Sequence, residues 1–435
     1  RGGHITAFNS SLQKKMGIDI DAAEIVRRLV AWGQGRMDER LLWMFARKCG
    51  DCMDWAIDIA GKHDTNVTLW EGYYKGPTYT EFPVTHFFYN KNINLDYTYG
   101  NSEGIGNVAL MPCFEEELKK AGVTLMYRTP AVQFIQDANK RVTGLIAGRP
   151  NNYTQINAAK GVIIATGGFG SNVEMRQAKN TGVWKEVTLD KNIPCTNNFK
   201  ASQGDGLKLA EQVGANVINL DDIQLHPGGT PKTGIMSSWP SGRNRIFLTP
   251  QGDRFVNEDA ARDTLCKAVF KEGGKYWIVS NHVKYPTLDY QSKNLTIGEM
   301  IKLGQAFSGN TIEELAQKTG MDPKKLRASI DTYNDVVTGK IKEDNLGFKK
   351  FTQDDKPMTE GPFYATPMVP AVHHTMGGIQ INSAAQVLDK AGHVIPGLFA
   401  AGEATGGVHG SNRVGGNGVA DAMVFGRISG QSALK

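Results

Sequence analysis

The spacing of apolar residues divides the chain into helical and extended segments. Between residues 22 and 59, apolar side chains recur at helical spacing, with a polar break near 33–39, so two helices are expected there. Comparable spacing predicts further helices at 106–121, 204–213, 311–318, 323–338 and 417–433.

Extended segments are predicted where the pattern changes to alternation or to short apolar runs. Two continuous runs end in a glycine turn: the run at 162–165 leads into Gly167, and the run at 398–401 leads into Glu403. Such short runs are typical of buried strands in a parallel sheet. Strand-like patterns also occur at 123–128, 132–137, 142–147 and 245–248.

The order of these segments predicts one domain interrupted by another. Residues 1–222 and 373–435 carry the buried runs of an α/β sheet, whereas residues 223–372 mix prolines, a strand-like segment and two helical segments. We therefore expect a first domain in two parts, with a second domain inserted between them.

Composition narrows the functional classes. A chain of 435 residues has room for two or three domains, and its apolar runs are far shorter than the roughly 20 residues that span a bilayer. Its 49 basic and 44 acidic residues are scattered along the chain, which argues against a nucleic-acid surface. Small or anionic ligands remain compatible with this charge, and the 50 glycines suit close approach of the backbone to a ligand.

The five cysteines are too few and odd in number for a disulfide framework in a chain of this length. Cys49 and Cys52 form a lone CxxC within a helical pattern. We interpret them as residues of a helix face, the alternative being a metal or redox site that lacks a second cysteine pair. The opening RGGH is neither a signal peptide nor a usual start, so a truncated N-terminus is expected.

The two glycine-ended strands indicate a nucleotide cofactor. Glycine lets the backbone approach a pyrophosphate at the carboxyl ends of parallel strands, where open α/β sheets bind their ligands. ATGG at 165–168 is a weak signal alone, but together with AGE at 401–403 it favours a flavin. No GxGxxG follows an early strand, so the ADP-binding turn is not expected in this chain.

A glycine-rich stretch precedes the last predicted helix. VHGSNRVGGNG at 408–418 runs directly into that helix. Free main-chain amides and the helix dipole make such a start suitable for negative charge, such as that at N1 and the C2 carbonyl of a reduced flavin. The alternative is a glycine-rich loop before a surface helix, and Glu403 just upstream favours the flavin.

Six motifs follow one another along nearly the whole chain: GVIIATGGFG at 161–170, GDG at 204–206, QLHP at 224–227, RFVNEDAARD at 254–263, HHTMGG at 373–378 and PGLFAAGEATGGVHGSNRVGGN at 396–417. This ordered set resembles the FAD-dependent fumarate reductase/succinate dehydrogenase flavoprotein family, especially its soluble flavocytochrome c and urocanate reductase-like branch. The last two motifs are the most specific.

The resemblance implies an α/β fold with a glutathione-reductase-type FAD-binding domain, truncated at its N-terminus, and an inserted α+β capping domain. The FAD-binding domain would comprise 1–222 and 373–435, and the capping domain 223–372. The reaction would be reduction of the C=C bond of an α,β-unsaturated carboxylate, with hydride from the flavin N5 of FAD and a proton from Arg262.

The resemblance also assigns roles to individual residues, with Arg262 as the catalytic acid. Substrate contacts would come from His226, Ser238, Trp239, His373, Arg413 and the Gly416 amide. Flavin contacts would come from Gly2, Gly3, Thr166, Gly167, Gly168, Asp205, His374, Glu403, Gly418 and Val419. A guanidinium offers a planar pair of donors to a carboxylate, which suits Arg413. The alternative for Arg262 is a buried ion pair with Glu258 or Asp263.

One segment departs from the family pattern. Where family fumarate reductases carry Thr-Glu-x-x-Arg, this chain reads SSWPSGR at 237–243. Ser238 can replace the threonine, but the relay glutamate is missing, and the arginine of the pattern is retained only if Arg243 takes its place. Trp239 either packs under the capping domain or faces a larger substrate. Aryl or heteroaryl acrylates therefore compete with fumarate-like dicarboxylates as the expected substrates.

Two other functions stay open. A ring-ketone or steroid dehydrogenase of the same family would not need the clamp of His373 and Arg413. A non-catalytic remnant or partner subunit would agree with the missing GxGxxG, but not with the retained arginines. For a reductase, the resemblance implies an electron donor, a haem, an FMN domain or a separate carrier, on other sequence or another chain.

Overall fold

The computed structural model describes residues 4–69, 84–93, 105–196, 201–231, 233–234, 236, 244–292, 295–350 and 355–435. Their helices are α1 (Ser11–Lys15), α2 (Ala22–Trp32), α3 (Glu39–Gly61), α4 (Asn107–Lys120), α5 (Val173–Ala178), α6 (Asp205–Gln212), α7 (Arg262–Lys271), α8 (Ile297–Lys302), α9 (Ile312–Thr319), α10 (Pro323–Val337) and α11 (Asn417–Ala433).

The strands in the first half of the chain are β1 (His4–Thr6), β2 (Thr65–Leu69), β3 (Thr85–Asn90), β4 (Ala131–Gln136), β5 (Val142–Arg149), β6 (Asn152–Asn157), β7 (Val162–Ile164) and β8 (Val217–Ile218). The later strands are β9 (Ile223–Gly229), β10 (Ile246–Leu248), β11 (Tyr276–Asn281), β12 (Gln291–Ser292), β13 (Leu295–Thr296), β14 (Phe307–Gly309), β15 (Phe363–Thr375), β16 (Gly378–Ile379), β17 (Gln386–Leu388) and β18 (Val394–Ala400).

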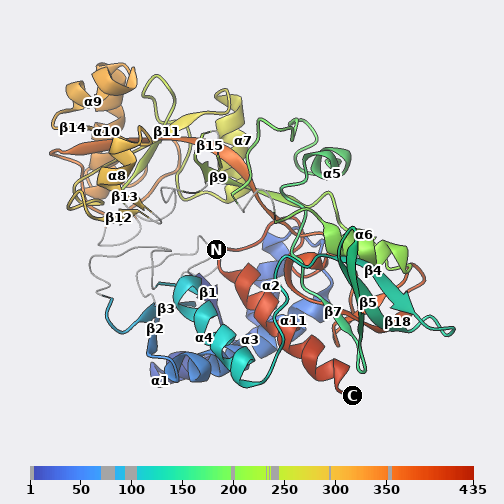
Figure 1. The fold of residues 1–435 in the computed structure, drawn as a ribbon. Coiled ribbons are helices and arrows are strands. Elements are labelled where there is room, and N and C mark those ends of the chain that lie inside the picture. The colour runs from blue at the N-terminus through green and yellow to red at the C-terminus, as the bar shows by residue number, and fades with distance from the viewer. Residues whose placement is uncertain are drawn as a thin grey trace.

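The two ends of the described chain share one body. In Figure 1 the blue helices α2 and α3 and the red helix α11 lie together in the lower half, and α11 contacts α3, β1 and β18. The yellow and orange elements, including α8, α9, α10 and β14, form a second body at the upper left. Strands β9 and β15 pair where the two bodies meet.

The two glycine-ended strands are neighbours, as the sequence predicts for a parallel sheet. β7 pairs in parallel with β18, and the register sets Ile163 opposite Phe399 and Ile164 opposite Ala400. β17 pairs antiparallel on the other side of β18. This pairing brings the loop after β7 next to the turn after β18, where Gly167 and Glu403 lie.

The helices predicted from long periodic segments are confirmed. The pattern between 22 and 59 forms α2 and α3, and Asp38 ends the break by accepting the Arg40 N–H as the N-cap of α3. α10 starts with Pro323 in its first turn, next to Asp322, whose carboxylate caps the helix. The last helix spans the predicted residues.

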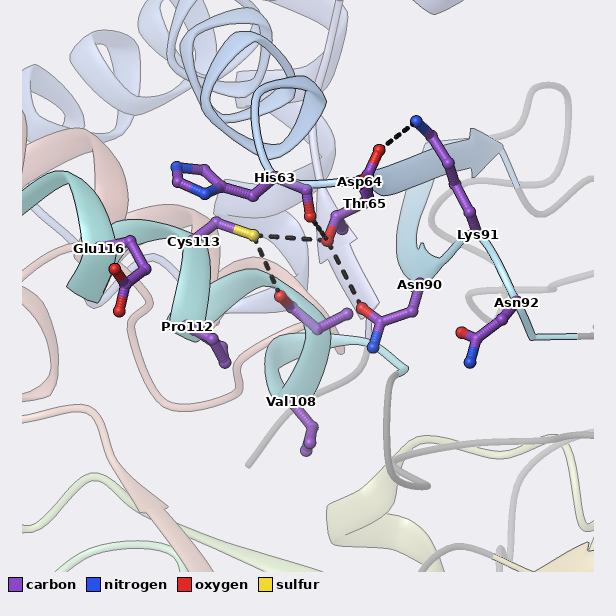
Figure 2. A pocket seen from close by; sticks show the side chains of 11 residues that line it. His63, Asp64, Thr65, Asn90, Lys91, Asn92, Val108, Pro112, Cys113 and Glu116 are labelled. Carbon is purple, nitrogen blue, oxygen red and sulfur yellow. Dashed lines mark hydrogen bonds and ion pairs between the residues drawn. The ribbon is translucent and has the colours of Figure 1, made fainter.

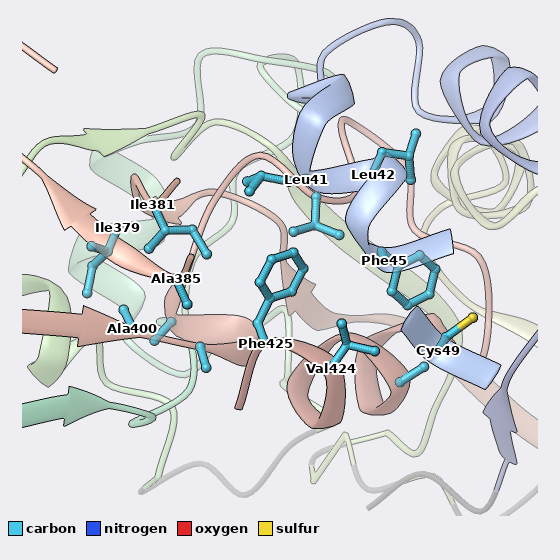
Figure 3. Packing of buried hydrophobic residues seen from close by; sticks show 14 of the residues in the cluster. Leu41, Leu42, Phe45, Cys49, Ile379, Ile381, Ala385, Ala400, Val424 and Phe425 are labelled. Atoms are coloured by element: carbon cyan, nitrogen blue, oxygen red, sulfur yellow. The ribbon is translucent and has the colours of Figure 1, made fainter. Parts of the chain in front are cut away.

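The buried core of the lower body joins segments far apart in the sequence. Figure 3 shows Leu41 and Phe45 of α3 packing near Val424 and Phe425 of α11, with Ile379 of β16 alongside. Three further apolar clusters draw all their buried members from residues between 246 and 368, in the upper body. Strands of this body form a sheet in the order β10-β11-β15-β14.

The strand predicted at 123–128 is wrong. These residues connect α4 to β4 without a strand; Arg128 adopts a φ of 55°, and the Tyr127 side chain is 71% exposed. Alternation of apolar and polar residues produces a strand only where a neighbouring strand can pair with it. No such neighbour occurs for this segment within the described residues.

Cys49 and Cys52 both lie in α3 and are buried there, as the interpretation of a helix face requires. Burial raises the pKa of the Cys49 thiol to about 12 and that of Cys52 to about 11. Because the thiolate is the reactive form, both groups are poor nucleophiles at neutral pH.

Candidate active site

Two histidines meet where β9 pairs with β15. The register of this pair shifts between Val372 and His374, which makes His373 the extra residue of a β-bulge. A bulge changes the direction in which a strand presents its side chains. The rings of His373 and His226 lie with their centroids 4.9 Å apart, so the structure brings these two predicted substrate residues together.

Each of these histidines has a defined partner at its Nδ1 atom. His226 Nδ1 accepts the main-chain N–H of Gly228 at 3.0 Å. His373 Nδ1 lies 2.6 Å from Thr196 Oγ1, which is buried on the neighbouring segment. Thr196 is therefore a residue of the site that the sequence analysis missed.

Gln224 joins the two predicted site arginines. Its Oε1 atom accepts from Arg262 Nη1 at 3.0 Å and from Arg413 Nη2 at 3.1 Å. Its Nε2 group donates to Asn412 Oδ1 and to the main-chain oxygen of Arg413. One buried amide thus fixes the separation of the two guanidinium groups.

The Arg413 guanidinium is buried among few acceptors. Its Nη1 donates to the main-chain oxygen of Val414 at 3.0 Å, and its Nε has no hydrogen-bond partner among the described residues. Burial, followed by the charge of Arg262, lowers the pKa of Arg413 to about 9. A carboxylate placed against this guanidinium would satisfy Nε and favour the charged form.

Arg262 is the first residue of α7, and its predicted alternative partners are engaged elsewhere. Glu258 accepts from Arg254, and Asp263 accepts from Asn412 Nδ2 at 3.0 Å. The Asp263 contact ties the start of α7 to the loop that carries Arg413. Arg262 therefore faces Gln224 and the site, in place of the ion pair considered from the sequence.

A second group of predicted residues lies around Glu403. Glu403 Oε1 accepts the Thr375 N–H at 3.0 Å, and Glu403 Oε2 lies 3.5 Å from His374 Nδ1. A Cβ added to Gly168 would collide with the Thr375 hydroxyl and lie 2.7 Å from Glu403 Oε1. The chain thus needs glycine at 168 for the loop after β7 to approach Glu403.

Burial controls the charge of this group. Burial raises the pKa of the Glu403 carboxyl to about 7, although the hydrogen bond from the Thr375 N–H acts to lower it. Burial, followed by Arg413, His409 and Arg262, lowers the pKa of His374 well below its usual value. Near neutral pH, His374 is therefore neutral and Glu403 is only partly ionised.

The start of α11 borders the same group. Gly416 is the N-cap of α11 in the left-handed conformation (φ 86°), and no side chain caps the helix within the described residues. A Cβ at Gly418 would lie 3.4 Å from both Arg413 and His374. Gly418 and Val419 are partly exposed, while the buried Asn417 Oδ1 has no hydrogen-bond partner in the described part of the chain.

Thr166 and Asp205 are the most exposed of the predicted cofactor residues that the structure describes. Thr166 follows β7, and Asp205 is the first residue of α6; both are exposed, whereas Gly168 is buried. A Cβ at Gly206 would collide with Thr166 Oγ1, so α6 and the loop after β7 are in close contact. Gly2, Gly3, Ser238 and Trp239 lie outside the described residues.

The residues that hold the predicted ones in place could not all be predicted from the sequence. Gln224 lies within the QLHP motif, and a glutamine in an otherwise buried strand was the available signal. Thr196, Thr375 and Asn412 act through hydrogen bonds to other segments of the chain. Thr375 and Asn412 lie within the last two motifs, whereas no motif includes Thr196.

A cavity of about 640 Å³ lies away from this site, between the end of α3, the ends of β2 and β3, and α4. Figure 2 shows His63, Lys91 and Cys113 among its lining side chains. Lys91 is paired with Asp64, and Cys113 donates to Thr65 Oγ1. None of the predicted site residues that the structure describes lines it.

The described residues hold no cluster of three or more histidine, cysteine or acidic side chains arranged to bind a metal. Within the same ranges, no helix combines the length and apolar character needed to cross a membrane.

A protein-family model described as "FAD binding domain" matches residues 1–419. Urocanate reductase from Eggerthella lenta is 31% identical over 438 residues, which cover 99% of this chain and 67% of that protein. NADH:acrylate oxidoreductase from Vibrio harveyi is 38% identical over 302 residues, or 68% of this chain. This chain spans only 29% of that oxidoreductase.

The fold is similar to a solved structure of the open conformation of a flavocytochrome c3 fumarate reductase. The TM-score is 0.75 at 28% identity, and the match covers 100% of this chain and 70% of that chain. The α/β architecture expected from the glycine-ended strands therefore agrees with that of a flavoprotein.

Proposed function

This chain belongs to the FAD binding domain family, and we propose that it reduces the C=C bond of α,β-unsaturated carboxylates. The observation that carries the proposal is the convergence of two histidines and two arginines, with Gln224 between the guanidinium groups. This arrangement gathers N–H donors, as recognition of a carboxylate requires.

The cofactor is FAD, and the residues around Glu403 fit it. Gly168 lies in a turn with no space for a Cβ, the start of α11 has no capping side chain, and Asn417 Oδ1 is buried without a partner among the described residues. We propose that Gly168, Glu403, His374 and the amides of Gly418 and Val419 hold the flavin, and that Thr166 and Asp205 contact it. When bound, FAD supplies the hydride.

The chain's own residues would bind and activate the substrate. Arg413, His373 and the Gly416 amide would hold the carboxylate, with His226 on the other side of the substrate. Donors to the carboxylate withdraw charge from the conjugated double bond and so favour addition of hydride at the β-carbon. In a buried site these donors act with little screening by water.

Arg262 would then deliver a proton to the α-carbon. An arginine has an ordinary pKa above about 12, so it is a weak acid in water. It can serve here because the carbon that develops negative charge is a strong base, and because Gln224 holds the guanidinium in a fixed direction.

The proposed domain division places the boundaries at 222/223 and 372/373. It is supported by the three apolar clusters whose buried members all lie between 246 and 368. The residues proposed as a capping domain would contribute His226 and Arg262, while the second part of the FAD-binding domain would contribute His373 and Arg413. The substrate would therefore lie between the two domains.

A ring-ketone dehydrogenase accounts less well for this site. A ketone substrate brings no negative charge to Arg413, and its Nε would stay unsatisfied in a buried position. The proposed reductase also requires a source of electrons to reduce the flavin. We propose a haem, an FMN-bearing domain or a separate carrier for this role.

The proposal is tested with the complete protein loaded with FAD. Under anaerobic conditions, reduced viologen serves as donor and its oxidation is followed with a panel of enoates and, as a control, a ring ketone. We expect turnover with at least one enoate and formation of the saturated acid. Turnover of the ketone alone, or of no compound by protein with full FAD content, would exclude the reductase.

A further inference from the structure

We propose that His373 takes up a proton when a carboxylate enters the site, that Thr196 is the positioning residue that permits this uptake, and that His226 stays neutral throughout. The inference rests on the proposed function and adds to it the protonation change that accompanies substrate binding. It is carried by the different hydrogen-bond partners of the two adjacent rings.

His226 is restricted to one neutral form by its partner. The main-chain N–H of Gly228 donates to His226 Nδ1 at 3.0 Å, and a main-chain N–H cannot act as an acceptor. Nδ1 must therefore keep its lone pair, and the ring proton resides on Nε2. A second proton would set two N–H groups against each other at a side chain that is 1% exposed.

His373 has no such restriction, because its partner is a hydroxyl group. Thr196 Oγ1 lies 2.6 Å from His373 Nδ1, and a hydroxyl can either donate or accept. When the ring is neutral with its proton on Nε2, the hydroxyl donates to Nδ1. When both ring nitrogens are protonated, the hydroxyl rotates and accepts. Protonation of His373 therefore preserves this hydrogen bond.

The main chain holds Thr196 in the position that this exchange requires. The Thr196 N–H donates to the Val372 oxygen at 2.8 Å, and the Val372 N–H donates to the Pro194 oxygen at the same distance. These bonds tie the segment that carries Thr196 to β15 directly before His373. The hydroxyl and the bulged histidine consequently keep their separation.

The charges around His373 couple its protonation to an anion. Among the described residues, the titratable groups that face it are His226, His374, Arg262 and Arg413. Burial, followed by His226 and the two arginines, lowers the pKa of His373 well below its usual value in the absence of an anion. A substrate carboxylate adds the negative charge that this group of residues lacks, and so favours the protonated ring.

The proton balance is simple. One proton passes from solvent or a buffer acid to His373 Nδ1 as the carboxylate binds; an N–H bond forms at His373, the bond that held the proton in the donor acid breaks, and no other covalent bond changes. Because binding takes up a proton, binding should weaken as the pH rises, by up to about tenfold per pH unit where uptake is complete. His373 would then enter catalysis as a charged donor to the carboxylate, beside Arg413.

The test is isothermal titration calorimetry of the FAD-loaded complete protein with succinate and with 3-phenylpropanoate, without any electron acceptor. Titration in buffers of different ionisation enthalpy gives the number of protons taken up per carboxylate. For the wild type we expect close to one proton near pH 7. Absence of uptake by a wild-type protein that binds either acid would overturn the proposal.

Matched variants separate Thr196 from its neighbours. Thr196→Val keeps the shape of the side chain but removes the hydroxyl, so proton uptake should be largely lost. Thr196→Ser should restore it. His226→Asn, whose Oδ1 can replace Nδ1 as the acceptor for Gly228, should still show uptake. Uptake that survives in Thr196→Val, or that disappears in a carboxylate-binding His226→Asn variant, contradicts the assignment.

A measurement on the wild type does not depend on how these variants fold. With ¹⁵N-labelled histidine, and His373→Asn and His226→Asn used only to assign signals, the His226 ring should keep its proton on Nε2 from pH 5 to 8. The His373 ring should gain its second N–H on carboxylate binding. If instead the enoate panel gives no turnover and no carboxylate binds, the proposed function fails; turnover without a change at His373 defeats only this inference.

Discussion

Two buried arginine clusters in this molecule are built in opposite ways. In the upper body, Arg254 donates to both carboxylate oxygens of Glu258, at 3.0 and 2.7 Å, and also pairs with Asp344. In the site, Arg413 donates to the amide oxygen of Gln224 and to a main-chain carbonyl. No carboxylate pairs with Arg413 within the described ranges.

The two arginines differ accordingly in their pKa values. Burial would lower the pKa of Arg254, but the charges of Glu258 and Asp344 raise it above the usual arginine value. For Arg413, burial and the nearby Arg262 lower the pKa to about 9. A buried charge with its own counter-ions supports the fold, whereas a buried charge without them is available to an anionic ligand.

Removing the proposed acid should have the largest effect on activity. Arg262→Ala should reduce turnover by about 10³-fold or more, since general acid catalysis contributes roughly 10² to 10⁴. Carboxylate binding should largely persist, because Arg413 and His373 remain. Steady-state rates and product binding of the complete protein measure both. Arg327→Ala, at an exposed ion pair with Glu313, is the control, and near-normal rates in Arg262→Ala would refute the acid assignment.

Removing the structural arginine should affect stability instead. Arg254→Met leaves Glu258 and Asp344 buried without their cation, and breaking a buried pair in this way costs about 3–5 kcal/mol. The free energy of unfolding should fall by that amount in urea denaturation. Arg27→Met, at an exposed pair with Glu24, should leave the free energy of unfolding nearly unchanged, because solvent screens an exposed ion pair. If both variants lost the same free energy of unfolding, the Arg254 cluster would have no special role in stability.

A positive charge at position 413 should not by itself be sufficient for enoate turnover. Arg413→Lys keeps a cation but loses the planar pair of donors, so turnover should fall by roughly 10²-fold through misplacement of the substrate carboxylate. The protein should stay folded and yellow, because the group around Glu403 is unchanged. Visible absorbance and enoate turnover test this expectation. A lysine variant with unchanged turnover would mean that the clamp needs only a positive charge.

The sequence was sufficient for the parts of this molecule that rest on local patterns. Periodicity predicted α3 and α11, and the glycine after each buried run predicted the neighbouring strands β7 and β18. The motifs also located Arg262, Arg413, His226 and His373, which the structure brings together. These features are encoded within a few consecutive residues.

What could not be predicted depends on contacts between distant segments. The alternation at 123–128 gave no strand, because pairing needs a neighbour that only the folded chain could supply. Thr196 reaches His373 from 177 positions away, and Gln224 reaches Arg413 from 189 positions away. The bulge at His373 depends on the register of β9 against β15, which neither strand specifies alone.

Gln224→Glu should make the surroundings of Arg413 resemble those of Arg254, which is paired with carboxylates. A carboxylate at this position would pair with Arg262 and Arg413, so the fold should be at least as stable as the wild type. Turnover should fall by about 10-fold to 50-fold, because the same carboxylate competes with the substrate for Arg413 and makes Arg262 a weaker acid.

The control for this exchange is Gln133→Glu, which adds the same charge at an exposed position of β4. It should change neither stability nor turnover. Thermal unfolding and turnover with one enoate measure both variants. Unchanged turnover in Gln224→Glu would show that Arg413 does not need to be free of carboxylates.

The smallest expected effect concerns which enoate is preferred. One partly unsatisfied guanidinium, Arg413, suits one carboxylate, and the segment at 237–243 lacks the glutamate of the family pattern. By the family pattern, Ser238 and Trp239 are expected where a second carboxylate would bind, and burying an unpaired charge there is unfavourable. We therefore expect fumarate not to be the best substrate. The specificity constant of an enoate with one carboxylate and a flat apolar or aryl end should exceed that of fumarate by a few-fold to about tenfold.

Specificity constants for fumarate, urocanate, acrylate and cinnamate, measured with the same reduced viologen, decide this. If fumarate leads by tenfold or more, a second cation, for which Arg243 is the candidate, must bind its other carboxylate.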